Sequence, residues 1–173
     1  LPIHNLLKKR LRALFFCDIA TNCHVMYKLS LLSAFFFVCT IASFGQYSGI
    51  NWMSLEEAIA AQAKEPKKIM MDVYTQWCGP CKMMMANTFT SEDVIAYINK
   101  HYYAVKFDAE SAEPVTYQGK TFSNPSWNPN ARGRNSTHEL SRALRVNAYP
   151  TLVYFDENAE VIAPISGYKT PGQ

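Results

Sequence analysis

Two cysteines separated by two residues are the feature of this sequence best suited to chemistry. Cys78 and Cys81 lie in the stretch "DVYTQWCGPCKMMM", which runs from Asp72 to Met85, with Gly79 and Pro80 between them. Such a pair can close a structural disulfide, supply half of a metal site or work as a reversible dithiol. The number of other cysteines in the mature chain decides between these uses.

The stretch that begins at Met26 has the layout of a secretory signal peptide. Lys28 gives it a basic start, an apolar run follows from Leu29 to Ile41, and small residues precede Gln46. The apolar run is shorter than the roughly 20 residues of a membrane-spanning helix. We therefore expect residues 26–45 to direct export, with an uncleaved membrane anchor as the alternative.

Residues 1–25 precede this complete signal and carry a basic cluster, so we expect them to be an upstream or non-native extension. An amphipathic extension is the alternative. Five of the 17 Lys and Arg residues and one of the 14 acidic residues lie before Gln46, which leaves 12 basic and 13 acidic residues and a formal net charge of −1. The remaining chain, residues 46–173, has the length of one domain, and its charge gives no argument for a nucleic-acid partner.

Only two cysteines remain in residues 46–173, because the other three precede Gln46: Cys17, Cys23 and Cys39. A structural zinc site usually needs four ligands. No second cysteine pair is present, and His101 and His138 are isolated, so we expect no metal. A disulfide that closes so small a loop would constrain the unfolded chain little. Redox chemistry is therefore the strongest interpretation of Cys78 and Cys81.

The pattern of residues 46–173 predicts helices and strands in alternation, followed by a terminal hairpin, which indicates an α/β fold with a mixed sheet. Helices are expected after a capping box at Ser54–Glu57, from 81 to 86, after a cap at Thr90 or Ser91, and after a capping box at Ser136–Glu139. Strands are expected at 68–74, at 102–110 and on both sides of a turn at 156–159.

Residues 111–135 interrupt this alternation, and we expect them to form an insertion on the surface of the domain. The stretch "VTYQGKTF" predicts a small hairpin that turns near Gly119. Tyr117, Phe122 and Trp127 are expected to pack the insertion onto the body of the domain. A partner-binding surface is the alternative use of these aromatic residues.

The stretch "WCGPC", Trp77 to Cys81, resembles the active-site motif of the thioredoxin-like family. Three further positions extend the resemblance: Asp72 ends the preceding strand, Lys106 lies in the next one, and Pro150 precedes a later strand in "AYPTLVYF". The resemblance covers roughly residues 52–168 without the insertion. It implies a thioredoxin fold, in which a central mixed β-sheet is flanked by helices.

The resemblance also assigns roles to the central residues. Cys78 is the expected nucleophile, because a helix that begins at the cysteine turn stabilises a thiolate with its N–H groups and dipole. Cys81 would resolve the mixed disulfide with the substrate. Asp72, buried in an apolar strand, should have a raised pKa and move a proton for Cys81. Lys106 either pairs with Asp72 and lowers that pKa or simply faces solvent.

Residues around the cysteines are expected to contact the substrate. They are Trp77, Gly79, Pro80, Tyr149 and Pro150, and the resemblance implies that the Tyr149–Pro150 bond is cis and faces the disulfide. Trp77 is expected to serve partly as core and partly as a lid beside the disulfide. Met83 to Met85 are expected in the helix core rather than at the substrate.

The sequence thus predicts an exported, periplasmic or extracytoplasmic thiol–disulfide oxidoreductase that acts on protein thiols and disulfides and needs no cofactor beyond its own disulfide. A membrane relay would supply its electrons. A non-catalytic thioredoxin-like binding module and a disulfide isomerase or chaperone are the alternatives. The chain ends at "GYKTPGQ", where a final helix would usually begin in this family. Either the sequence is a fragment or the fold lacks this helix, and in the second case we expect an exposed apolar sheet face and reduced stability.

Overall fold

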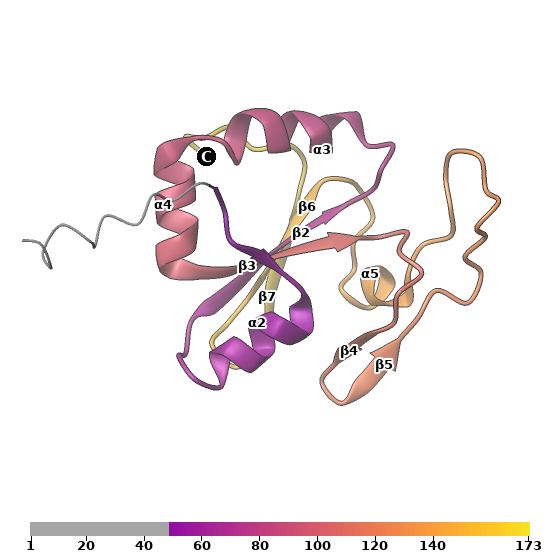
Figure 1. Ribbon diagram of the computed structural model, residues 1–173, viewed down its shortest axis with the longest axis horizontal. Helices are drawn as coiled ribbons and strands as arrows, with labels where there is room; N and C mark the ends of the chain where they lie inside the picture. The colour runs from indigo at the N-terminus through magenta and orange to yellow at the C-terminus, as the bar shows by residue number, and fades with distance from the viewer. Residues whose placement is uncertain (1–48) are drawn as a thin grey trace, which may run out of the picture. The chain divides into compact units, whose positions relative to one another are not determined.

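The computed structural model describes residues 49–173 and shows a five-stranded mixed sheet at the centre of this part of the chain (Figure 1). Its strand order is β1-β3-β2-β6-β7, in which β1, β3 and β2 are parallel and β6 and β7 are antiparallel to their neighbours. The expected extension 1–25 and signal peptide 26–45 lie outside the described residues. The strands are β1 (Trp52–Met53), β2 (Lys68–Tyr74), β3 (Tyr102–Asp108), β6 (Thr151–Phe155) and β7 (Val161–Ser166).

Helices cover both faces of the sheet, as the thioredoxin fold requires. One face packs against α2 (Leu55–Gln62), α5 (Glu139–Ala143) and a separate hairpin, while the other packs against the π-helical turn η1 (Met84–Thr88) and α4 (Glu92–His101). Helix α3 (Gly79–Met83) leads directly into η1. No helix among residues 49–173 is long and apolar enough to span a bilayer.

Strand β2 places the site residue Asp72 because side chains alternate between the two faces of a strand. Ile69, Met71 and Val73 enter the core beneath α2 and α5, whereas Met70 enters the opposite core. Asp72 is two residues after Met70 and therefore lies on the same face as Met70. The predicted strand 68–74 is confirmed with the same bounds.

Short-range sequence signals predicted several elements correctly. The capping box of α2 is present, since Ser54 Oγ accepts the Glu57 N–H at 3.1 Å and Glu57 Oε2 accepts the Ser54 N–H at 2.7 Å. The terminal hairpin turns at residues 156–159 between β6 and β7. Ser91 is the N-cap of α4, as expected, but its side chain makes no capping hydrogen bond.

The predicted capping box at Ser136–Glu139 is wrong. The N-cap of α5 is His138, whose Nδ1 accepts the Leu140 N–H at 3.1 Å. Ser136 instead donates its hydroxyl to Asn124 Oδ1 at 2.6 Å. The reason is burial: His138 is fully enclosed, with 0% exposed, and Phe107 packs edge-on against its ring. Leu140, which follows the cap, enters the core as expected.

The helix expected at 81–86 is present only in part, because α3 changes to the π-helical turn η1 at Met84. The Phe89 N–H bonds to the Met84 carbonyl, five residues back, at 3.0 Å. Of the three methionines expected in the core, Met84 is buried, but Met83 is 51% exposed, so that part of the prediction is wrong. Cytosolic thioredoxins carry a proline where this turn holds Ala86.

The insertion at 111–135 contains the predicted hairpin, β4 (Val115–Tyr117) and β5 (Lys120–Phe122), with Gly119 at the turn. Tyr117 and Phe122 pack into the main core, and the Tyr117 hydroxyl donates to the Ala159 carbonyl at 2.8 Å. These two aromatics therefore attach the insertion to the domain body, as predicted. Trp127, in contrast, is 40% exposed.

No helix follows β7 within the described part of the chain, and residues 167–173 run as an irregular segment (Figure 1). A groove of about 660 Å³ remains between this segment, α4 and the sheet, and it is lined by Met70, Tyr154 and Ile165 among others. Ile165 is 43% exposed, whereas Met70 is only 3% exposed. The exposed apolar sheet face and the reduced stability both stay predictions.

Candidate active site

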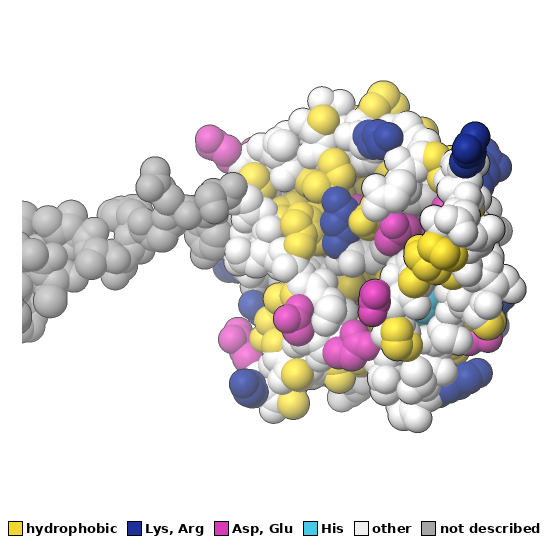
Figure 2. Space-filling model, turned by 45° about the vertical axis from the view of Figure 1, so that its right-hand side comes forward, with side chains coloured by type: hydrophobic (Ala, Val, Ile, Leu, Met, Phe, Trp, Pro, Cys, Tyr) yellow, Lys and Arg dark blue, Asp and Glu magenta, His cyan; other side chains and the backbone are white. Residues whose placement is uncertain are grey.

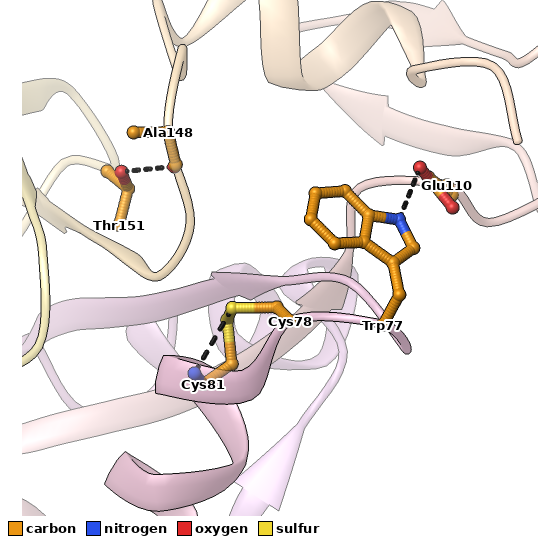
Figure 3. The surroundings of a disulfide bond; sticks show 6 residues. All are labelled: Trp77, Cys78, Cys81, Glu110, Ala148 and Thr151. Carbon is orange, nitrogen blue, oxygen red and sulfur yellow. Dashed lines mark hydrogen bonds between the residues drawn. A yellow bond between two sulfur atoms is a disulfide. The ribbon is translucent and has the colours of Figure 1, made fainter. Parts of the chain in front are cut away.

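Cys78 and Cys81 form a disulfide at the start of α3, with their Cα atoms 5.3 Å apart. Cys78 is the N-cap of this helix, and its Sγ accepts the Cys81 N–H at 3.1 Å (Figure 3). Pro80 fits the first turn because it has no N–H to leave unpaired. No acidic residue stands in that turn. After reduction, the same N–H and the helix dipole would favour a thiolate on Cys78.

Both sulfur-bearing residues are enclosed in the disulfide form. Cys78 is 2% exposed and Cys81 is 3% exposed. Reaction of Cys78 with a protein substrate therefore requires groups around it to move.

Trp77 stands beside the disulfide and is held from three directions. Its indole N–H donates to Glu110 Oε1 at 2.9 Å (Figure 3). Its ring meets the Tyr149 ring edge-on, with centroids 5.9 Å apart, and the Arg134 guanidinium lies 4.0 Å from its ring centroid. Trp77 itself is 37% exposed, which agrees with a lid rather than a core tryptophan.

The loop before β6 faces the same end of the sheet. The Tyr149–Pro150 bond is cis, as the resemblance implied. The Thr151 hydroxyl donates to the Ala148 carbonyl at 2.8 Å and fixes the loop across this proline (Figure 3). Pro150 has no N–H, and its carbonyl accepts the Gly167 N–H from the end of β7 at 2.8 Å. Tyr149 and Pro150 therefore lie where they were expected, and substrate contact stays a prediction.

Asp72 is a buried carboxylic acid next to this site. It is 1% exposed, and neither carboxylate oxygen has a hydrogen-bond partner among the described residues. Burial raises its pKa from 3.8 to about 6, while the positive charge of Lys106 opposes that rise. A carboxyl group with this pKa can exchange a proton near neutral pH. The predicted burial of Asp72 is confirmed, and its role stays a prediction.

Lys106 lies directly across the β2–β3 pair from Asp72. The two side chains form no ion pair within 4 Å, since the one ion pair in residues 49–173 joins Lys67 and Glu65. The Lys106 ammonium instead lies 4.7 Å from the centroid of the Tyr74 ring. Lys106 thus acts on Asp72 through its charge at a distance.

A small pocket beside the cysteine turn was not expected from the sequence. It holds about 360 Å³ and is bordered by Cys81, Lys106, Thr75, Met85 and neighbouring residues. A pocket of this size is large enough for water beside Cys81, and Thr75 and Lys106 supply polar groups on its wall.

Glu110 and Arg134 belong to the site but were missed by the sequence analysis. Glu110 follows β3 and bonds to Trp77, whereas Arg134 comes from the end of the insertion. Glu110 reaches Trp77 across 33 residues of sequence, so no local spacing marks it. No local pattern marks Arg134. Within residues 49–173 no three His, Cys, Asp or Glu side chains come together as metal ligands, and His101 and His138 lie in separate elements.

Comparisons with known proteins agree with this architecture. The chain is 29% identical over 98 residues to the thiol:disulfide interchange protein DsbD of Actinobacillus pleuropneumoniae, covering 57% of this chain and 13% of that protein. It is 31% identical over 64 residues to a thioredoxin-like protein of Synechocystis, covering 37% of this chain and 58% of the relative. The chain thus spans less than two thirds of the length of these relatives.

Solved structures show the same fold. A putative disulphide-isomerase from Bacteroides thetaiotaomicron superimposes with a TM-score of 0.50 and 27% identity, covering 74% of this chain and 89% of that one. A thioredoxin from Thermus thermophilus gives a TM-score of 0.51 with 16% identity, covering 72% and 80%. The family model of the thioredoxin-like domain matches residues 55–173. This chain therefore belongs to the thioredoxin-like domain family.

Proposed function

We propose that this protein is an exported thiol–disulfide oxidoreductase that reduces or exchanges protein disulfides through Cys78 and Cys81. The observation that carries the proposal is the disulfide at the start of α3, with Cys78 Sγ accepting the Cys81 N–H. The similarity to an interchange protein and to a putative disulphide-isomerase supports a redox role of this general kind. The Cys78–Cys81 pair itself carries the electrons, so the reaction needs no separate cofactor.

In the first step, the Cys78 thiolate attacks one sulfur of a substrate disulfide. A bond forms between Cys78 and that sulfur, and the other substrate sulfur leaves as a thiolate that takes a proton from solvent. The Cys81 N–H and the dipole of α3 favour the ionised nucleophile before the attack. Groups around Cys78 must move for this step, because Cys78 is only 2% exposed in the oxidised protein.

In the second step, Asp72 accepts the proton of the Cys81 thiol, directly or through water. The Cys81 thiolate attacks Cys78 Sγ, the bond between Cys78 and the substrate breaks, and the second substrate sulfur leaves and is protonated. The substrate has then gained two electrons, and the protein has lost two and regained its disulfide. A pKa of about 6 makes Asp72 a weak enough acid to accept and return this proton.

The direction of electron flow is proposed from the residues between the cysteines. Gly79 and Pro80 resemble the reducing end of the family, whose potential is about −270 mV, whereas a strong oxidant lies near about −120 mV. This gap corresponds to about 7 kcal/mol for a two-electron couple. A reductant outside the cytoplasm needs a dithiol donor, and we propose a membrane electron relay as that partner.

The proposed extracytoplasmic location is supported by the signal-like residues 26–45, which combine a basic start with a short apolar run. An exported domain with two cysteines in all would also avoid unwanted pairing in an oxidising compartment. Detection of the mature protein in a periplasmic or secreted fraction, with its N-terminus near Gln46, tests this point. A protein retained in the cytoplasm with the segment intact would contradict it.

Isomerisation is the second candidate, favoured by the 27% identity to a putative disulphide-isomerase. This reaction begins with the same attack by Cys78 but does not require Cys81, since the substrate itself displaces Cys78. A Cys81→Ser variant that still rearranges scrambled ribonuclease would favour isomerisation. Loss of activity in this variant, with retention of the mixed disulfide, would favour reduction.

Equilibration of the protein with glutathione buffers tests the proposed function. We expect a potential near about −270 mV, measured by alkylation and mass spectrometry of Cys78 and Cys81. A value near about −120 mV would reverse the proposed direction. A Cys81→Ser variant should capture substrates from a cell-envelope extract as mixed disulfides, and Cys78→Ser is the matched control. If the control retains the same partners through non-covalent contacts, the protein is a binding module rather than an enzyme.

A further inference from the structure

The end of the insertion is attached to the active-site turn by one carboxylate. Glu110 accepts the Trp77 indole N–H through Oε1 at 2.9 Å and the Asn135 N–H through Oε2 at 3.0 Å. One carboxylate oxygen of Glu110 therefore binds the active-site turn, and the other binds the end of the insertion. This arrangement holds the residue before Asn135, Arg134, against the face of the Trp77 ring, 4.0 Å from the ring centroid.

Residues 128–135 form a closed loop, which we call the arginine loop. The Asn128 N–H donates to Asn135 Oδ1 and the Asn135 side-chain amide donates to the Asn128 carbonyl, both at 2.9 Å. These reciprocal bonds close the loop at its base and present Arg132 and Arg134 at its exposed end. The positive φ of Gly133, 100°, turns the chain between the two arginines.

The arginine loop carries positive charge, whereas residues 46–173 as a whole have a formal net charge of −1. Residues 114–138 contain Lys120, Arg132 and Arg134 but no Asp or Glu. In Figure 2, basic side chains project at the upper right, and acidic and basic groups elsewhere on this face are interspersed. Within residues 49–173 neither arginine forms an ion pair, since the ion pair present joins Lys67 and Glu65.

Two carboxylates at the end of β3 keep their negative charge, because their hydrogen-bond donors are neutral: Asp108 accepts the Gln76 amide at 2.9 Å, and Glu110 accepts the N–H groups of Trp77 and Asn135. Neither carboxylate forms an ion pair with Arg134. Lys82, in α3, adds a further positive charge on the cysteine turn. The N–H groups of a guanidinium point outward in its own plane. When the guanidinium stacks on an indole, these N–H groups stay free to bind a carboxylate through two parallel hydrogen bonds.

We propose that the arginine loop is a substrate-recognition element and that Arg134 selects polypeptide segments carrying Asp or Glu beside the target cysteine. The inference rests on the proposed function, because it concerns which disulfides reach Cys78. Trp77 directly precedes Cys78 and stands beside the disulfide (Figure 3), and Arg134 lies on the face of that ring. A carboxylate next to the substrate cysteine then meets Arg134 before the sulfur–sulfur attack begins.

Three model peptides test this proposal on the reduced Cys81→Ser variant of the full chain, in which Cys17, Cys23 and Cys39 are also replaced by Ser so that Cys78 is the one thiol. Each carries one cysteine joined to the same chromogenic thiol, and the flanking residues are acidic, neutral or basic. The rate of chromophore release measures attack by Cys78, and the acidic-to-basic ratio cancels any change in the reactivity of the Cys78 thiolate. We expect a ratio of about five at low salt, the upper range for one exposed charge pair. Added salt at about 1 M should reduce it towards one.

Variants at position 134 test whether Arg134 causes the preference for the acidic peptide. The ratio should fall towards one in Arg134→Ala, invert in Arg134→Glu and survive in Arg134→Lys. Lys100→Glu, which makes the same charge change on the exposed side of α4, should leave the ratio unchanged. A ratio that is the same in Arg134→Glu and in the parent would overturn the proposal while leaving the proposed function intact.

If no peptide reacts, a binding measurement distinguishes failure of the recognition proposal from failure of the proposed redox function. Fluorescent peptides with serine in place of cysteine are titrated against the oxidised protein, and anisotropy gives Kd. Tighter binding of the acidic peptide that depends on Arg134 would support recognition even without exchange, in which case only the proposed redox function fails. Equal Kd values for the three peptides would overturn the recognition proposal.

Discussion

Replacing Asp72 by Asn should stabilise the folded protein at neutral and alkaline pH. The carboxyl group is buried, and its oxygens have no hydrogen-bond partner among the described residues. Burial therefore penalises the ionised form, which raises the pKa to about 6. An Asn amide has nearly the same shape but cannot ionise, so the variant avoids this penalty at every pH.

The magnitude follows from the two pKa values. The ordinary value is 3.8 and the folded value is about 6, so the folded state binds more protons than the unfolded state between these limits. The stability that protonated Asp72 supplies is thus fully present below pH 3.8 and is lost as pH rises through about 6. At about 1.36 kcal/mol per pKa unit, the loss reaches about 3 kcal/mol above pH 7 and about half of that near pH 5.

Urea unfolding of the oxidised protein and of Asp72→Asn, measured from pH 4 to pH 8, gives the difference between their free energies of unfolding. The difference in free energy of unfolding should grow by about 1 to 2 kcal/mol between pH 5 and pH 8. Asp156→Asn is a control of opposite sign, because Asp156 accepts the N–H groups of Asn158 and Glu160 at 2.9 and 2.8 Å, which lower its pKa. The stabilisation that ionised Asp156 gives the folded protein is present at neutral pH and is lost as pH falls.

A constant difference between Asp72→Asn and the parent across this pH range would refute the reasoning. It would mean that the Asp72 carboxylate ionises in the folded protein as it does in the unfolded chain. The proton-transfer role assigned to Asp72 would then lose its physical basis, because that role depends on a pKa near neutrality.

Three further changes have expected outcomes. Lys106→Gln should raise the pKa of Asp72 above about 6, since the Lys106 charge lowers it, and carbon NMR of the Asp72 carboxyl measures the shift. Glu110→Ala should speed hydrogen exchange of the Asn135 amide and the indole N–H by about tenfold or more, because both bond to Glu110. His138→Ala should lower the free energy of unfolding by about 2 to 3 kcal/mol, since it removes a buried helix cap, and unchanged urea midpoints would contradict this.

Elements with strong local signals were predictable from the sequence. Strand β2 is a short apolar run, and the reciprocal Ser54 and Glu57 bonds need only residues three apart. The hairpin β4–β5 follows from alternating residues around Gly119. In each case the local pattern is sufficient to indicate the element, although β2 is completed by pairing with β3 and β6.

Elements decided by distant contacts were not predictable in the same way. Ser136 has the right spacing to cap α5, but its hydroxyl bonds to Asn124, and a buried histidine takes the cap position. The π-helical turn after α3 likewise has no signal in "MMANT". Packing of these segments against the rest of the domain chose between local alternatives that were close in energy.

The candidate site shows the same division. Cys78, Cys81, Asp72 and Pro150 were found because their spacing resembles a known family, and the structure brings them to one end of the sheet. Arg134 comes from an irregular loop and reaches Trp77 only through contacts that span more than 20 residues in sequence, such as the Glu110 bond to Asn135. No periodicity or spacing predicts such a contact.

The pKa of the Cys78 thiol in the reduced protein tests the central claim most directly. It can be followed by the pH dependence of alkylation, with each cysteine assigned by mass spectrometry and with Cys81→Ser, which leaves Cys78 as the one thiol of residues 46–173, as a control. The account predicts that Cys78 titrates near about 7, well below the ordinary value of about 8.5, and that Cys81 titrates higher. Two thiols that both titrate near about 8.5 and react at equal rates would contradict it.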